Sequence, residues 1–189
     1  MSITSFLKFN VILLIFLTLL LSCASTVHIQ PHATPISTTH QSEEEAAIYI
    51  SPSDLSKVHS QSLFFGGDIK MPLGTPLKEL SQEAFSPFFQ RIFFAGSNSP
   101  NVALYVIEVG LGNIDVTQGL DTHLTINCKV NKKGESIFVG DFEGKGTGTA
   151  AAGFLGESLA REQIRKSAEA ALIDAFKKAQ TAYKEFIEQ

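Results

Sequence analysis

The thiol of Cys23 is the side chain that the sequence places best for covalent chemistry. It closes the tetrapeptide Leu20-Leu21-Ser22-Cys23, at the end of an apolar run over residues 11–21 that only Thr18 interrupts. A membrane-spanning helix needs about 20 apolar residues, so a run of this length is typical of the apolar part of a secretory signal peptide. Cys23 therefore stands where such a signal would be cut, and we expect its thiol to carry a lipid anchor.

The tetrapeptide resembles the lipobox of bacterial lipoproteins, with Leu20 and Ser22 at matching positions and Leu21 bulkier than the usual residue. The resemblance implies that residues 1–22 are removed as a signal peptide, and that Cys23 is acylated on its thiol and on its new amino group, palmitate being an expected acyl group. Each buried methylene contributes about 0.8 kcal/mol, so several chains would make the attachment stable. The alternative is an ordinary signal peptide cut by another peptidase, in which Cys23 has no such role.

A second unusual segment is the glycine-rich stretch at residues 144–156. It does not fit a phosphate-binding loop, because Lys145 comes too early and is not followed by Ser or Thr. It does not fit a dinucleotide fingerprint either, since that motif belongs to a βαβ unit. We interpret the stretch as a flexible strand-to-helix connection. The alternative is a loop that contacts the membrane or a neighbouring copy of the chain, with these candidate residues: Gly144, Gly146, Gly148, Gly153, Phe154 and Leu155.

Catalytic motifs are not evident in the sequence. It contains no Gly-x-Ser-x-Gly elbow, no His-Glu-x-x-His pair and no Cys-x-x-Cys, so no nucleophile and base can be named by spacing. Asp115, Asp121, His123 and Asp141 are polar groups on or beside predicted strands, where a solvated sheet face commonly carries such residues. We therefore expect a protein that is not an enzyme and that needs no cofactor.

A cluster of metal-binding residue types lies near the start of the chain. His28, His32 and His40 precede three glutamates at residues 43–45. Pro31 and Pro35 prevent a helix from aligning His28 with His32, and a flexible site must overcome a large ordering entropy. We expect no metal site there.

The composition of the chain limits the classes of binding partner that we expect. The formal net charge is −4, and removal of a signal peptide that contains Lys8 would make it more negative. The sequence shows no cluster of Lys and Arg on one face, which argues against nucleic acid as a binding partner. If Cys23 carries lipid, Cys128 is the only remaining thiol, so the fold must be held by packing without an intramolecular disulfide.

The sequence after Cys23 predicts a flexible, solvated tether at residues 23–46 and one domain at residues 47–189. Residues 47–50 read as a strand, residues 76–93 as a helix kinked or split by Pro87, and residues 156–187 as a long alanine-rich helix. Residues 102–111, 120–130 and 137–142 read as consecutive strands of a meander. We therefore predict an α+β domain in which an antiparallel sheet of about four to five strands carries two main helices on one face, the long helix last.

This layout resembles small outer-membrane lipoproteins of Gram-negative bacteria, such as YajG-type lipoproteins and the accessory lipoproteins of polysaccharide export. Ala24 follows the cysteine where an aspartate would favour the inner membrane, so the resemblance implies an outer-membrane anchor that faces the periplasm. We expect a non-enzymatic structural or accessory protein of an envelope assembly or transport system, with a protein partner or self-association. The alternative is a carrier of lipid or another apolar ligand, lined by Phe88, Phe89, Phe93 and Phe94 between the first long helix and the sheet.

Overall fold

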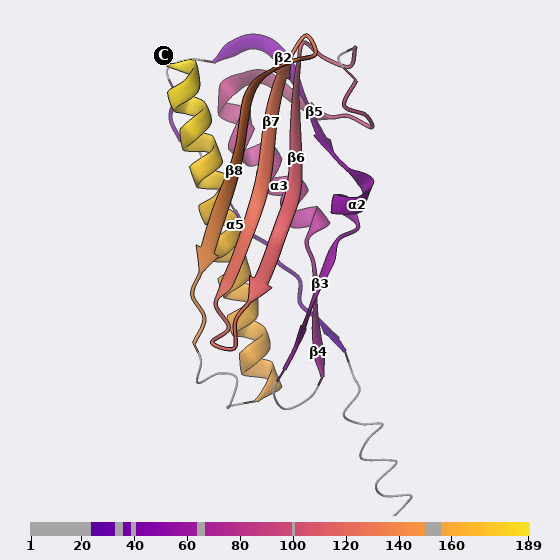
Figure 1. The fold of residues 1–189 in the computed structure, drawn as a ribbon, viewed down its shortest axis with the longest axis vertical. Helices are drawn as coiled ribbons and strands as arrows, with labels where there is room; N and C mark the ends of the chain where they lie inside the picture. Colours follow the sequence, from indigo (N-terminus) through magenta and orange to yellow (C-terminus); the bar gives the residue numbers. More distant parts are fainter. Residues whose placement is uncertain (1–23, 33–35, 39–40, 64–66, 100, 150–155) are drawn as a thin grey trace, which may run out of the picture.

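The computed structural model describes residues 24–32, 36–38, 41–63, 67–99, 101–149 and 156–189, so Cys23 and the predicted signal peptide lie outside the described residues. The fold is α+β, as the sequence predicts, and contains a five-stranded and a three-stranded sheet (Figure 1). The larger sheet has the order β5-β2-β6-β7-β8, which are Phe89–Phe94, Ser42–Ile50, Tyr105–Val116, Thr122–Lys132 and Glu135–Gly146. The smaller sheet has the order β1-β4-β3, which are Ser25–Thr26, Asp68–Pro72 and Val58–Ser62.

The predicted meander forms most of the larger sheet. β6 pairs with β7 and β7 with β8, both antiparallel. The alternation along β7 buries Leu124, Ile126 and Cys128 on one face, which is the period-two pattern of a half-buried strand. β2, however, runs parallel to both β5 and β6, so the sheet is mixed. Parallel neighbours need a long crossover connection, and the chain between β2 and β5 supplies it.

That crossover corrects the predicted helix over residues 76–93. The helix α3 covers Gly74–Phe85 and is followed by a short 3-10 turn, Ser86–Phe88, and then by strand β5. Pro87 cannot donate a hydrogen bond to a preceding turn, so the α-helix ends there. The residues after it pair with β2, as Ile92 does with Ala46, and this ladder replaces the second half of the predicted helix.

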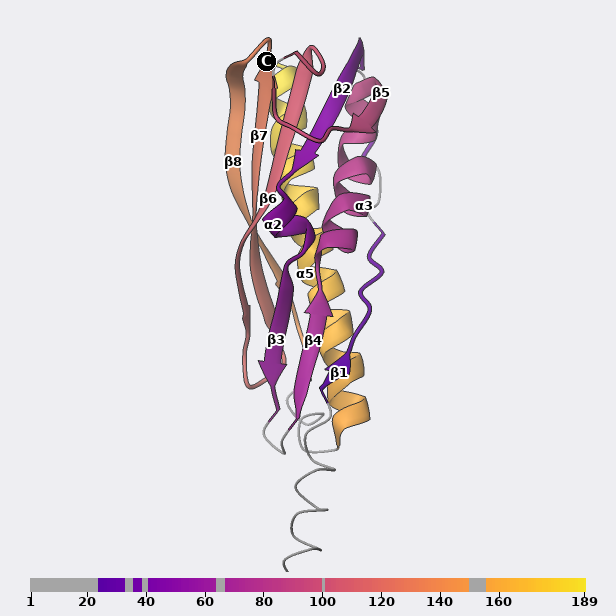
Figure 2. The same cartoon turned by 90° about the vertical axis from the view of Figure 1, so that its right-hand side faces the viewer.

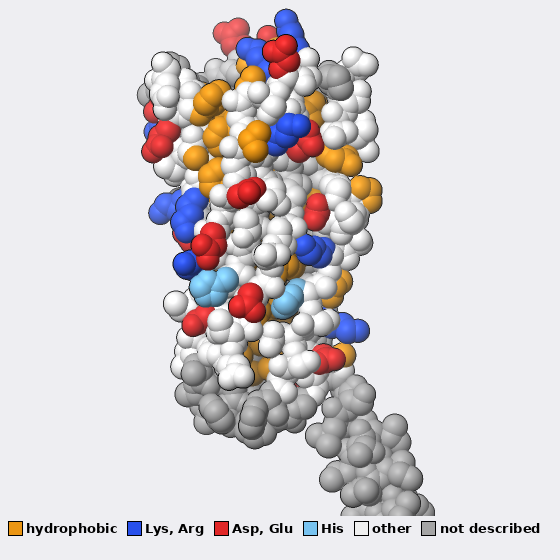
Figure 3. All heavy atoms as spheres, viewed as in Figure 1, with side chains coloured by type: hydrophobic (Ala, Val, Ile, Leu, Met, Phe, Trp, Pro, Cys, Tyr) orange, Lys and Arg blue, Asp and Glu red, His pale blue; other side chains and the backbone are white. Residues whose placement is uncertain are grey.

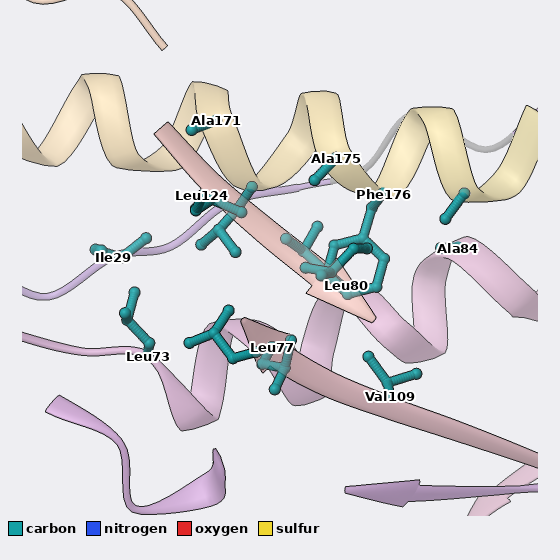
Figure 4. Close-up of a cluster of buried hydrophobic side chains, with 14 of the residues drawn as sticks. Ile29, Leu73, Leu77, Leu80, Ala84, Val109, Leu124, Ala171, Ala175 and Phe176 are labelled. Carbon is teal, nitrogen blue, oxygen red and sulfur yellow. The ribbon is translucent and has the colours of Figure 1, made fainter. Parts of the chain in front are cut away.

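The long C-terminal helix α5, Glu157–Ile187, confirms the prediction for the last element. It lies beside α3 on one face of the larger sheet, with the short helix α2, Pro52–Leu55, at the junction of the two sheets (Figure 2). Leu77 and Leu80 of α3 and Phe176 of α5 are fully buried in one cluster, in which Leu80 lies near Phe176 (Figure 4). None of the helices in the described ranges is both long and apolar enough to cross a membrane.

The N-terminal segment is not the solvated tether that its polar composition predicts. Val27 and Ile29 are each only 4% exposed and belong to the hydrophobic core. The backbone N–H of Gln30 donates to Glu169 of α5 at 3.0 Å, and the carbonyl of Ser37 accepts from Lys184 of α5 at 2.9 Å. Val27 and Ile29, together with the partly buried Ile36 and these hydrogen bonds, hold the described part of this segment against the core.

Candidate interaction surfaces

The glycine-rich stretch begins inside strand β8. Gly144 and Gly146 are buried residues of that strand. A Cβ atom on Gly144 would collide with the carbonyl oxygen of Ala171, and one on Gly146 with that of Ser167. The two glycines therefore let α5 lie directly on β8. They are not free to bind a partner, which corrects that part of the predicted interaction loop.

The remaining residues of the predicted loop divide into two groups. Gly148 is half-buried, and its backbone N–H donates to Asp121 at 2.7 Å. This bond gives Asp121 a structural role between the β6–β7 turn and the end of β8. Gly153, Phe154 and Leu155 lie outside the described residues.

Strand β8 is an outer strand of the larger sheet, so one row of its backbone groups points away from β7. Side chains of α5 cover the second half of that row. The N–H of Lys145 donates to Asp174 at 3.1 Å, and the carbonyl of Glu143 accepts from Lys178 at 2.7 Å. Burial opposes the ionisation of Asp174, but hydrogen bonds from Lys178 and from the Lys145 backbone hold its pKa below the ordinary value. Asp174 and Lys178 thus cap this half of the edge.

The first half of the same edge is open. In an antiparallel strand alternate residues direct their backbone groups to the same side, so Val139 and Asp141 face the edge as Glu143 does. Among the described residues, no side chain is hydrogen-bonded to these backbone groups of Val139 and Asp141. Hydrophobic side chains gather over this part of β8 (Figure 3). Val139 is 68% exposed, and Phe186 at the end of α5 is 41% exposed.

Aromatic rings fill the space behind this open edge. The ring of Tyr183 on α5 lies 5.1 Å from that of Phe88 and 5.3 Å from that of Phe138, between ring centroids. Tyr183 is buried, and burial raises the pKa of its hydroxyl. The fold thus brings Tyr183 of α5 together with rings from α3, the 3-10 turn, β5 and β8.

The four phenylalanines proposed for an apolar ligand do not gather in one place. Phe88 and Phe89 line an open pocket of about 220 Å³ together with Tyr105 and Tyr183. Phe93 and Phe94 are not part of that lining. The structure therefore divides the predicted set between a pocket and the outer strand β5, because residues 89–94 form a strand.

The face of the sheet opposite the helices carries several polar side chains as well as the exposed Val139. Asn127 donates to Asp141 at 2.6 Å, on the rim of an open pocket of about 340 Å³. His123 lies 3.5 Å from Glu143, and Asp115 is its partner across the β6–β7 ladder. Each of the four polar residues Asp115, Asp121, His123 and Asp141 thus has a neighbour in or beside the sheet, and their positions do not bring a nucleophile to a base.

The histidines of the N-terminal segment lie along α3. His28 and His32 are exposed and, with Glu79 and Glu83, line an open pocket of about 610 Å³. The distance between His32 Nδ1 and Glu83 Oε1 is 3.6 Å. Within the part of the chain that the structure describes, no three His, Cys, Asp or Glu side chains are arranged to hold a metal ion. His40 lies outside that part.

Cys128 faces the core from the centre of β7, as the alternation of that strand predicts. Its side chain is buried, and burial raises the pKa of the thiol from 9.0 to about 12. A thiol is reactive as the thiolate, so Cys128 is protected from modification in the folded protein.

No family model matches the sequence, and no curated protein matches it. The fold is similar to that of protein XCC0632 from Xanthomonas campestris, a DUF330 protein, with a TM-score of 0.63, 10% sequence identity, and coverage of 88% of this chain and 98% of that chain. More distant are a provisionally assigned lipoprotein from Caulobacter crescentus, with a TM-score of 0.43, 15% identity and coverage of 61% and 82%, and the PelC dodecamer from Paraburkholderia phytofirmans, with 0.34, 13%, 75% and 94%. Of these three, the first has a TM-score above 0.5, and it shows that this chain shares the fold of a DUF330 protein.

Proposed function

We propose that the chain is a lipid-anchored, non-enzymatic protein of the Gram-negative envelope, and that it acts as an accessory component of an assembly or transport system through a protein contact at β8. The anchor is Cys23, acylated after removal of residues 1–22, and the location is the periplasmic face of the outer membrane. The lipobox-like tetrapeptide supports the anchor. The observation that supports the protein contact is the open half of the β8 edge.

An open edge strand with exposed apolar side chains is a template for pairing with another strand. Most natural edges are protected by charge, bulges or covering elements, and here α5 protects one half of β8 through Asp174 and Lys178. The open half carries Val139, which is 68% exposed, and no Lys or Arg lies between Glu135 and Glu143. Because only one half of the β8 edge is protected, we infer that the open half binds another strand.

The occupant that fits best is a second copy of this chain. Phe138 and Phe142 stand symmetrically on either side of Gly140, and their rings stack at 6.2 Å. Antiparallel pairing of two β8 strands around Gly140 places Phe138 of each copy opposite Phe142 of the other. It also pairs the open backbone groups of Val139 with those of Asp141, and the contact is isologous, as in a two-fold dimer.

The test is in-cell crosslinking of the tagged protein, followed by mass spectrometry of the complexes and of Cys23 from the membrane fraction. We expect acyl chains on Cys23 and a crosslinked dimer. Val139→Lys puts a charge on the open edge and should remove the dimer. Val58→Lys is the matched control, because Val58 is a strand valine that is 49% exposed on β3, and this variant should keep the dimer.

Three results would count against the proposal. A chain that carries no acyl group on Cys23 contradicts the anchor. A wild-type protein that stays monomeric contradicts the contact, and so does a dimer that survives Val139→Lys. If Val139→Lys removes a crosslink to a different protein, the surface is correct and the second copy is the wrong occupant.

The carrier alternative is favoured by one observation, the pocket of about 220 Å³ beside Phe88 and Tyr183. Ligand sites usually enclose about 300–1,000 Å³, so this pocket suits a small apolar group better than a whole lipid. The space between α3 and the sheet is occupied by side chains such as Leu80 and Phe85, which are fully buried. The interaction role is therefore the stronger proposal.

A further inference from the structure

The fold begins almost immediately after the predicted anchor. Only Ala24 separates Cys23 from Ser25, which is already paired with Ile69 of β4. The backbone N–H of Val27 donates to the carbonyl of Lys70 at 2.9 Å. Two residues of extended chain span about 7 Å, so a lipid on Cys23 would hold the domain itself close to the bilayer.

β1 identifies the end of the molecule that would be held. It lies beside the β3–β4 hairpin and the first turn of α5, at the end opposite the C-terminus, which we call the lower end (Figures 1 and 2). Arg161 donates to Glu157 at 2.6 Å, and this bond, with the neighbouring Ser25 hydroxyl, lowers the pKa of Glu157. The start of the described chain and the start of α5 are therefore next to each other.

Helix α5 sets the distance between the lower end and the opposite, upper end. It contains 31 residues, which corresponds to about 46 Å at 1.5 Å per residue. It runs along the long axis of the molecule (Figure 1). Leu159 lies in its first turn and is 46% exposed, whereas Phe186 lies in its last turn and is 41% exposed.

We propose that the domain stands directly on the lipid bilayer by its lower end, with its long axis pointing away from the membrane and no flexible tether between anchor and fold. The occupant of the lower end is a lipid surface, because Ser25 of β1 lies at this end and the proposed acylation site, Cys23, precedes it by two residues in the sequence. The inference rests on the anchor in the proposed function. It places the open half of β8 and Phe186 at the far side, roughly the length of α5 from the membrane.

The absence of tryptophan from the sequence permits a clean test by energy transfer. Leu159→Trp and Phe186→Trp place single donors of similar exposure at the two ends of one helix. Each variant is purified in its membrane-bound form, the mass of the Cys23 peptide is measured, and the protein is reconstituted into phosphatidylethanolamine–phosphatidylglycerol vesicles with a dansyl-labelled headgroup as acceptor. Urea unfolding checks that each variant is folded.

We expect strong transfer from Trp at position 159 and weak transfer from Trp at position 186. A flexible insertion of about 20 Gly and Ser residues between Ala24 and Ser25, with a reach of about 25 Å, should reduce the difference between the two donors. Equal transfer from both donors in an acylated protein would overturn the seating and leave the anchor intact. A Cys23 without acyl chains would overturn the anchor, and the seating with it, so the two failures are distinguishable by mass.

Discussion

Two glycines of β8 determine how closely the last helix packs against the sheet. Gly144 and Gly146 face the carbonyl oxygens of Ala171 and Ser167, and neither has room for a Cβ atom. We predict that Gly146→Ala lowers the free energy of unfolding by about 3 kcal/mol, because the added methyl group overpacks a close helix–strand contact. Urea unfolding measures this value.

Gly96 provides the control for that substitution. A Cβ atom there meets nothing within 4 Å, so Gly96→Ala should change stability by less than about 1 kcal/mol. If both alanines are tolerated equally, α5 does not depend on close approach at β8, and the glycine-rich stretch would again be free for another role.

At the scale of elements, α5 both covers the sheet and protects half of its edge. The variant Asp174→Ala with Lys178→Ala removes the two side chains that are bonded to the Lys145 and Glu143 backbone. We predict a loss of about 1–2 kcal/mol in the free energy of unfolding, as expected for two hydrogen bonds. We also predict stronger self-association, because a longer stretch of edge becomes open. Sedimentation velocity at increasing concentration measures the association.

The matched control is Glu162→Ala with Lys166→Ala, another pair on α5 spaced by four residues, with 3.4 Å between its charged atoms. Among the described residues, the ion pairs of Glu162 and Lys166 are made within α5, and Glu162 also pairs with Arg165. This control variant should lower the free energy of unfolding by about 0.5 kcal/mol and leave the association state unchanged. Equal self-association in both variants would show that a loss of surface charge, rather than the open edge, is responsible.

At the scale of the whole molecule, the N-terminal segment decides where the domain begins. Val27 and Ile29 are part of the core, so we predict that Val27→Ala with Ile29→Ala lowers the free energy of unfolding by about 4 kcal/mol. His28 lies between them and is exposed, and His28→Ala should leave stability nearly unchanged. A double variant as stable as the wild type would mean that the segment behaves as a tether and that the domain starts near residue 47.

Elements whose signal is local could be predicted from the sequence. The alternation of apolar and polar residues around Ile126 predicted β7, and the helical spacing of alanines such as Ala168 and Ala175 predicted α5. Pro87 marked the region where the predicted helix is interrupted. The first two predictions depend on the periodicity of the segment itself, and the third on the absence of a backbone N–H in proline. None of them requires knowledge of the element that packs against the segment. The inward position of Cys128 followed in the same way.

Features that depend on a distant part of the chain could not be predicted in this way. Composition cannot show that β4 and α5 receive Val27 and Ile29, because two apolar residues in a polar segment carry no periodic signal. Residues 89–94 form a strand because their backbone pairs with that of β2. Asp174 and Lys178 became edge caps because the position of α5 on β8 brought them to its backbone. These outcomes depend on which elements become neighbours, and that choice is made by the packing of the whole chain.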